Sequence, residues 1–227
     1  MLFSLTLLRV PFDAQMAVIE MGANHQGEIA GYCQYTAPSH GLINNVGKAH
    51  LEGFGGIEGV KKGKGELFDY LRSNKGTAFV NADFDYLVEM SEGIAHIVKY
   101  GTGSDEYIVK GYLLEAEPFL QLELQHEHMR LLVNTQLVGA YNLPNVLAAA
   151  AVGLHFGVDM SDIKSALQNY VPSNSRSQLV EYKEHRIILD AYNANPSSMK
   201  LAIENLAQLP YQHKILILGA MAELGQD

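Results

Sequence analysis

Short apolar runs alternate with helical patterns at the start of this chain, and that alternation restricts the fold more than any other feature. Met16–Met21, Gly41–Val46 and Thr77–Val80 are nearly continuous apolar runs, which is typical of strands buried on both faces of a parallel sheet. Between them, Glu28–Tyr35 and Ile57–Leu71 have helical periodicity. Strands that alternate with helices form βαβ units. The sequence therefore predicts an α/β fold with a mostly parallel sheet flanked by helices.

The pattern changes between Tyr107 and Val138, where apolar and polar residues alternate, most clearly at Leu120, Leu122 and Leu124. A period of two is typical of half-buried strands, so we expect an antiparallel meander added to the parallel sheet. Two helices are expected after it. The first spans residues 142–157, with an asparagine suited to the N-cap, a proline in the first turn and a glycine at the end. The second starts after residue 161.

A polar, turn-rich segment at Val171–Ser177 separates this part of the chain from a second one. We therefore expect a central domain at residues 1–174 and a C-terminal domain at residues 175–227. The second domain resumes the βα alternation, which predicts the start of a Rossmann-like domain. Its expected elements are strands at Arg186–Asp190 and Lys214–Leu218 and a helix at Ser197–Leu209. Two strands are too few to bury a sheet on both faces, so we expect a C-terminal truncation.

The composition excludes several classes of function. Sixteen Lys and Arg residues against 25 Asp and Glu residues give a net charge of −9, which argues against nucleic acid as a partner. The longest apolar run, Val146–Val152, is far too short to span a bilayer. Cys33 is the only cysteine and cannot form an internal disulfide, which fits a reducing, cytoplasmic compartment. We interpret it as a small core residue.

Two side chains that can bind metals lie where predicted strands end. Glu20 ends the first strand, Gly22 allows a sharp turn after it, and His50 follows the second strand by a few residues. Open parallel sheets bind ligands at the carboxyl ends of their strands. There a carboxylate suits Mg²⁺, and a histidine suits a metal or a phosphate. On position alone, Glu20 fits a metal ligand and a partly exposed turn residue equally well, whereas His50 fits a surface loop better.

Lys64 falls on the apolar face of the predicted helix at residues 57–71. Burial lowers the pKa of a lysine, and a neutral amine beside a metal site can react with CO₂ to give a carbamate, which is an anionic oxygen ligand. Periodicity alone favours a simpler interpretation, in which the stem packs and the ammonium reaches water. Lys62 and Glu66 fall on the polar face, where they can pair at i,i+4.

Two further residues could contact a nucleotide. Arg176 lies between the two expected domains, and its fork of donors suits a phosphate. Asp190 ends a predicted strand and could accept a hydrogen bond from a ribose hydroxyl. Each has an ordinary alternative, namely a solvated arginine and a helix-capping aspartate.

Six segments, in family order and over nearly the whole chain, resemble the Mur ligase family. The most specific are Ala-Asn-His-Gln-Gly-Glu at residues 23–28 and Tyr-Asn-Ala-Asn-Pro at residues 192–196. The resemblance implies a Mur ligase central domain followed by the beginning of the C-terminal ligase domain. The six segments are Ala17–Glu28, Asn45–Gly55, Lys64–Phe68, Gly139–Asn145, Asp190–Pro196 and Leu218–Gly225.

The resemblance also implies roles for individual residues. Glu20, His50 and Lys64 would bind magnesium ions and serve catalysis, with the lysine as a carbamate, which reverses the interpretation that periodicity favours. The residues implied to contact ATP are Asn142, Asn145, Arg176 and Asp190. The residues implied to contact the other substrates are Asn24, His25, Asn193 and Asn195.

The implied activity is ATP-dependent amide bond formation in peptidoglycan synthesis, and hence a role in cell shape and division. A carboxylate of UDP-N-acetylmuramoyl-tripeptide attacks the γ-phosphate of ATP to form an acyl phosphate, and the amine of D-alanyl-D-alanine then displaces phosphate. Metal ions and cationic side chains suit this chemistry because charge develops on phosphoryl oxygens. The oligomeric state stays open, with a monomer as the expectation.

The sequence departs from the family pattern in three ways. It contains no Gly-x-x-Gly-Lys-[Ser/Thr] phosphate loop, it lacks the glycine that commonly precedes Arg176, and Ala191 stands where serine is frequent. We therefore expect a fragment, truncated at both ends, that is inactive alone. Two alternatives stay open. One is a sibling ligase with another amino-acid substrate, such as a folylpolyglutamate or diaminopimelate/lysine-adding type. The other is a non-catalytic α/β remnant.

Overall fold

A mixed six-stranded sheet forms the centre of the molecule. The computed structural model describes residues 7–48, 50–104, 106–173 and 175–221. The strand order is β1-β2-β3-β4-β5-β6, with three parallel pairs from β1 to β4 and two antiparallel pairs from β4 to β6. The expected parallel sheet with an added antiparallel meander is thus confirmed. The strands are β1 (His40–Leu42), β2 (Thr77–Asn81), β3 (His96–Gly101), β4 (Val109–Glu115), β5 (Phe119–His126) and β6 (Met129–Val138).

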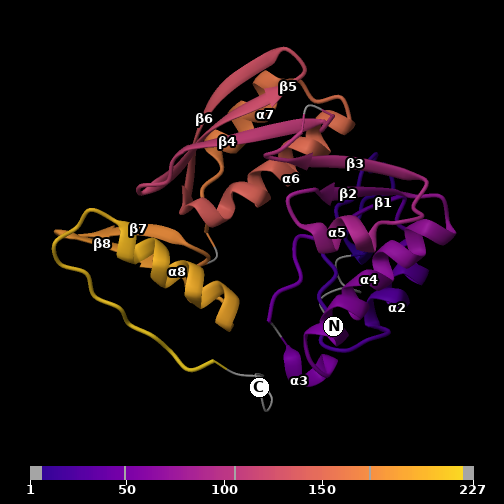
Figure 1. Ribbon diagram of the computed structural model, residues 1–227, viewed down its shortest axis with the longest axis horizontal. Coiled ribbons are helices and arrows are strands. Elements are labelled where there is room, and N and C mark those ends of the chain that lie inside the picture. Colours follow the sequence, from indigo (N-terminus) through magenta and orange to yellow (C-terminus); the bar gives the residue numbers. More distant parts are fainter. Residues whose placement is uncertain (1–6, 49, 105, 174, 222–227) are drawn as a thin grey trace.

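Helices cover both faces of this sheet (Figure 1). Neighbouring residues of β2 point to opposite faces, as the strand geometry requires. Phe79 belongs to a buried cluster with α6 and α7, whereas Ala78 and Val80 belong to a second cluster with α2 and α4. The helices of the first face are α6 (Leu143–His155) and α7 (Met160–Asn169), and those of the second are α2 (Glu28–Thr36), α4 (Ile57–Ser73) and α5 (Asp85–Met90).

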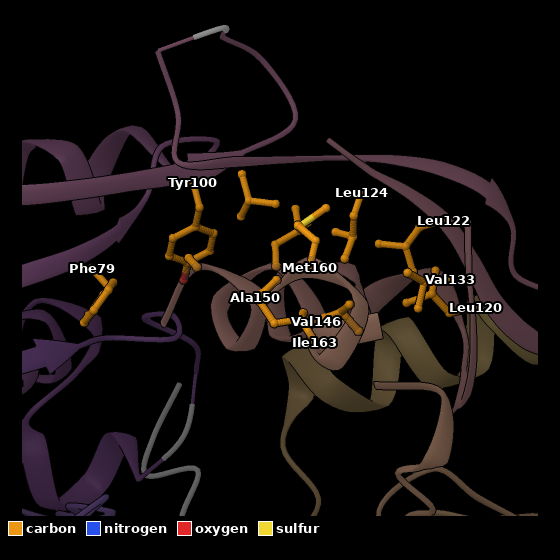
Figure 2. Close-up of a cluster of buried hydrophobic side chains, with 13 residues drawn as sticks. Phe79, Tyr100, Leu120, Leu122, Leu124, Val133, Val146, Ala150, Met160 and Ile163 are labelled. Carbon is orange, nitrogen blue, oxygen red and sulfur yellow. The ribbon is translucent and has the colours of Figure 1, made fainter. Parts of the chain in front are cut away.

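The larger buried cluster joins the meander to α6 and α7 (Figure 2). Leu120, Leu122 and Leu124 alternate along β5, and all three are fully buried against residues of these helices such as Ala150 and Ile163. Full burial of one such leucine contributes about 1.5–3 kcal/mol. The predicted alternation is therefore correct, and its apolar positions hold the meander against the helices.

The helices agree with the sequence-based predictions to within a few residues. Residues 28–35 and 57–71 were the predicted ranges of α2 and α4, and Asn142 occupies the N-cap position of α6. Gly157, just beyond α6, has a φ of 77°, which favours glycine. Cys33 is fully buried, and this burial raises the pKa of its thiol to about 11. Its interpretation as a core residue is thus confirmed.

Two predicted strands are wrong. Met16–Met21 and Lys214–Leu218 belong to no strand, and most of their apolar side chains are exposed, with Val18 at 85% and Ile217 at 93%. Apolar character alone does not make a strand, because the backbone also needs a neighbour for its N–H and C=O groups. No described segment pairs with either run. The strand expected at Gly41–Val46 forms only over His40–Leu42.

The C-terminal part forms a separate group beside the main sheet (Figure 1). An antiparallel hairpin of β7 (Gln178–Tyr182) and β8 (His185–Leu189) precedes α8 (Pro196–Gln208). β8 and α8 match predicted elements, whereas β7 was not predicted. Within the described ranges, no helix combines the length and the apolar character needed to cross a membrane.

Candidate active site

The carboxyl ends of β1, β2, β3 and β6 lie along one edge of the sheet. β6 shares the direction of the parallel strands because it runs antiparallel to β5, which in turn runs antiparallel to β4. The loop after β1 carries Asn45 and leads to His50, and α6 begins directly after β6 near Asn142. Two groups of predicted site residues therefore lie at the edge where open parallel sheets bind ligands.

The three segments that carry Glu20, His50 and Lys64 meet in a small buried cluster. Its buried residues are Val60 from α4 and Leu51 and Phe54 from α3 (Leu51–Phe54). Ala23 from the loop after Glu20 and Val46 from the loop before His50 are partly buried and pack against them. The packing is close, because a side chain at Gly53 would collide with the carbonyl oxygen of Asn24. The structure thus brings together segments that are far apart in the sequence.

Lys64 lies on the inner side of α4, as its periodicity predicts. Its Nζ donates a hydrogen bond to the Asn45 carbonyl at 2.7 Å, and desolvation by the surrounding protein lowers its pKa. A lower pKa leaves more of the amine neutral and available for reaction with CO₂. A carbamate at Lys64 would keep one N–H, which could still donate to the Asn45 carbonyl, and its two oxygens could bind a metal ion.

The two other predicted metal ligands differ in their surroundings. Glu20 is exposed, and its carboxylate makes no hydrogen bond or ion pair with any residue that the structure describes. His50 has a φ of 53° at the N-cap position of α3. Among the described residues, no three His, Cys, Asp or Glu side chains form a metal-binding group. An accessible carboxylate and a desolvated lysine that can be carbamylated are oxygen ligands of the kind that magnesium prefers, and the segments that carry them meet in this cluster.

Two glutamates hold the loop that carries Asn24 and His25. Glu66 accepts hydrogen bonds from Gly27 N at 2.6 Å and Ala30 N at 2.9 Å, at the start of α2. Glu28 accepts from Asn24 N at 2.7 Å, and this bond is the main cause of the lowered pKa of its carboxyl group. Sequence reasoning missed Glu66 and assigned it to a pair with Lys62. The hydrogen-bond partners of Glu66 lie 36 and 39 residues away in the sequence, and the periodicity of one helix does not reveal partners on another element.

The residues implied to contact ATP gather at the start of α6. Asn142 Nδ2 donates to the Val138 carbonyl at 2.9 Å, and Asn145 Nδ2 donates to Asn142 Oδ1 at 3.1 Å. Asn142 therefore occupies the N-cap position without making the usual side-chain capping bond. Both asparagines lie at the start of α6, which follows the carboxyl end of β6.

A hydrogen-bonded network connects this turn to the C-terminal part. Tyr141 OH donates to Ser177 Oγ at 2.7 Å, and Asp190 Oδ1 accepts from Ser177 N at 3.2 Å. Burial raises the pKa of Tyr141. Asp190 thus accepts from Ser177, and Arg176 stacks its exposed guanidinium over Tyr192 at 4.0 Å from the ring centre. Sequence reasoning missed Tyr141 and Ser177.

The loop with Asn193 and Asn195 leads into α8. Asn193 Oδ1 accepts from Ala194 N at 2.9 Å. Asn195 forms a reciprocal capping box with Ser198, with distances of 3.0 and 3.2 Å. Lys48 N donates to Ser197 Oγ at 3.2 Å, so α8 begins beside the loop that leads to His50. Residues 222–225 of the last motif lie outside the described residues.

Comparisons with known proteins assign the chain to a family. The family model described as Mur ligase middle domain matches residues 2–153, and the one described as Mur ligase, glutamate ligase domain matches residues 175–227. UDP-N-acetylmuramoyl-tripeptide–D-alanyl-D-alanine ligase of Escherichia coli is 38% identical over 98% of this chain and 50% of its own length. The Bacillus subtilis protein of the same name is 30% identical over 97% of this chain and 48% of its own length.

Solved structures show the same fold. MurF from Acinetobacter baumannii superposes with a TM-score of 0.85 and 32% identity, over 97% of this chain and 48% of that one. MurF ligase from Thermotoga maritima, solved in complex with ADP, has a TM-score of 0.78 and 26% identity, over 91% of this chain and 48% of that one. The chain spans about half the length of the curated relatives it matches. This chain belongs to the Mur ligase family.

Proposed function

We propose that this chain forms the central part of an ATP-dependent ligase that adds D-alanyl-D-alanine to UDP-N-acetylmuramoyl-tripeptide in the cytoplasm. The observation that carries this proposal is the 38% identity over nearly the whole chain with the Escherichia coli ligase of that activity. The convergence of the predicted site residues at the carboxyl edge supports it. The proposal includes a central domain at residues 1–174 and a C-terminal domain that begins at residue 175.

The proposed reaction has two steps. A carboxylate oxygen of the tripeptide attacks the γ-phosphorus of ATP, ADP leaves, and an acyl phosphate forms. The amine of D-alanyl-D-alanine then attacks the acyl carbon, and phosphate and a proton leave. Asn142 and Asn145, at the start of α6, and Asp190, directly after β8, would orient the nucleotide. Arg176 would move from Tyr192 to a phosphate. Asn24, His25, Asn193 and Asn195 would position the other substrates.

In this proposal, Glu20, His50 and carbamylated Lys64 would hold magnesium. The bound ions would neutralise the charge that develops on phosphoryl oxygens. Lys64 supports this role because it is desolvated and directed at the loop after β1. Its hydrogen bond to Asn45 would fix the carbamate in orientation.

A chimera tests the substrate assignment. Residues 1–227 would replace the matching half of the Escherichia coli ligase, and ADP release would be measured with UDP-N-acetylmuramoyl-tripeptide and a panel of amine acceptors. We expect release that depends on D-alanyl-D-alanine. Release that depends instead on glutamate, lysine or diaminopimelate would assign a sibling activity, and a chimera that folds but releases no ADP would favour the non-catalytic alternative.

Two lysines on opposite sides of α4 test the magnesium assignment in the same chimera. Lys64→Ala removes the proposed carbamate, so we expect a loss of at least about 100-fold in kcat that short-chain carboxylic acids partly restore. Lys62→Ala changes an exposed lysine of the same helix and should leave kcat within about twofold. Full activity of the Lys64→Ala chimera would show that the metal-binding role is wrong.

A further inference from the structure

We propose that His40 and His155 form a second metal site, which binds a divalent transition metal ion such as Ni²⁺, Cu²⁺ or Zn²⁺. The two side chains come from elements far apart in the sequence. His40 begins β1, and His155 is the last residue of α6. Their Nε2 atoms lie 3.1 Å apart.

This separation suits two ligands of one metal ion. Metal–nitrogen bonds of about 2.0–2.1 Å place neighbouring imidazole nitrogens about 2.9–3.4 Å apart, for angles between square-planar and tetrahedral. The observed 3.1 Å lies within this range. Without metal, one Nε2–H donates to the other Nε2. When a metal binds, the donating imidazole would shift its proton from Nε2 to Nδ1. Both rings would then stay neutral, and binding would release no net proton.

The surroundings of the pair hold both rings in place. Ser39 Oγ lies 2.9 Å from His40 Nδ1, where it can accept the Nδ1–H and leave Nε2 free for the metal, as partners of metal-bound histidines commonly do. Phe79, shown in Figure 2, contacts both imidazoles, with ring centres 6.0 Å from His40 and 5.2 Å from His155. Phe156 contacts both as well, at 4.9 and 5.0 Å. These two phenylalanine rings restrict the rotamers of both imidazoles, so less side-chain freedom is lost when a metal binds.

The ligand type and the exposure indicate the class of metal. Imidazole nitrogens favour Cu²⁺, Ni²⁺ and Zn²⁺ over Mg²⁺ and Ca²⁺, which prefer oxygen. No third His, Cys, Asp or Glu joins the pair in a metal-binding group within the described part of the chain. His155 is exposed and His40 is half-buried, so water could fill the remaining coordination positions. Desolvation and the neighbouring His155 lower the pKa of His40, which reduces competition from protons at neutral pH.

This site is separate from the candidate active site. His40 lies at the amino end of β1, and α6 extends about 20 Å from Asn142 at the carboxyl edge to His155. A metal bound here would connect the end of α6 to β1. It would stabilise the folded state by mass action, without contact with the residues proposed to hold magnesium or ATP.

Titration of the whole, untagged chain with NiCl₂ tests the proposal. Isothermal calorimetry should show one strong equivalent of Ni²⁺, and the melting temperature should rise with Ni²⁺ and fall back with EDTA. His40→Ala and His155→Phe should each weaken binding by at least about tenfold. His155→Phe keeps a ring among the aromatic neighbours. His128→Ala, in the exposed turn between β5 and β6, is the matched control and should bind like the original chain.

A measurement on the unmodified chain makes the test independent of variant folding. The electron paramagnetic resonance spectrum of one equivalent of Cu²⁺ should show coupling to two imidazole nitrogens. Paramagnetic Ni²⁺ should broaden the ring signals of His40 and His155 before those of other histidines. The proposal is wrong if other histidines broaden first, if fewer than two nitrogens couple, or if both folded variants bind Ni²⁺ as tightly as the original chain.

Discussion

Glu66 shows how one side chain can position a whole loop of the candidate site. The N-terminus of a helix leaves backbone N–H groups without partners, and Gly27, at the N-cap of α2, has no side chain to supply one. Glu66 reaches across from α4 and accepts from Gly27 and Ala30. The same bonds hold the loop with Asn24 and His25 beside α4, so helix stability and site geometry depend on one carboxylate.

We expect Glu66→Ala to lower the free energy of unfolding by about 1–2 kcal/mol, because capping bonds at a helix N-terminus have this magnitude. Glu66→Gln keeps one accepting oxygen and should lose less. Urea unfolding followed by far-UV circular dichroism measures both. Glu115→Gln, in an exposed position of β4, is the control and should change little. An effect of Glu66→Ala no larger than that of the control would contradict the capping role.

The buried thiol of Cys33 has a measurable pH dependence. Burial raises its pKa from 9.0 to about 11, so between these values the unfolded chain loses a proton that the folded chain keeps. Stability from this group is therefore complete below pH 9 and decreases as pH rises towards 11. Because the thiolate is the reactive form, the folded chain at pH 8 should react with Ellman's reagent at least about 100-fold more slowly than the urea-unfolded chain. Equal rates in the two states would show that the thiol is accessible.

At the scale of elements, the glycines of α4 differ in how closely neighbouring elements approach them. A methyl group at Gly59 would collide with the carbonyl oxygen of Phe54, which belongs to α3. At Gly65, in the same helix, the nearest atom to such a methyl group is the end of the Met90 side chain, at 3.4 Å. Of these two glycines, only Gly59 must lack a side chain, because α3 and the loop with His50 approach the helix closely at that residue.

This difference predicts opposite effects of the same substitution. Gly59→Ala should destabilise the chain by about 2 kcal/mol or more, because backbone must move to make room. Gly65→Ala should stabilise it by up to about 1 kcal/mol, because alanine is the better helix former. Thermal unfolding of the two variants measures both signs. A destabilised Gly65→Ala variant together with an unchanged Gly59→Ala variant would mean that α3 and α4 pack differently.

Elements were predictable from the sequence where their signals are local. Helix α4 carries its apolar stripe within its own 17 residues, and β5 carries its alternation within eight. The run at Met16–Met21 has equally clear apolar character, yet a strand also needs a paired neighbour, which no pattern within six residues reveals. The same holds for Glu66 and Ser177. Their residue types were visible, but the partners that give them a function are brought together only by the fold.

At the scale of the whole molecule, the central and C-terminal parts differ in how much they bury. Most buried apolar residues belong to the two clusters on either side of the six-stranded sheet, and α8 buries none of its residues. The bonds between the two parts are few and polar, such as those of Tyr141 with Ser177 and of Lys48 with Ser197. The central part should therefore hold most of the stability.

We accordingly expect residues 1–173 to unfold cooperatively without the rest of the chain, with a urea midpoint within about 10–15% of that of residues 1–227. Far-UV circular dichroism suits the measurement because the sequence contains no tryptophan. Limited trypsin digestion of the longer chain should cut first after Arg176 or Lys214, which flank the exposed C-terminal group, and should leave a resistant central fragment. If residues 1–173 show no cooperative transition, the hairpin and α8 are part of one folding unit with the sheet, and the proposed domain boundary at residue 174 is wrong.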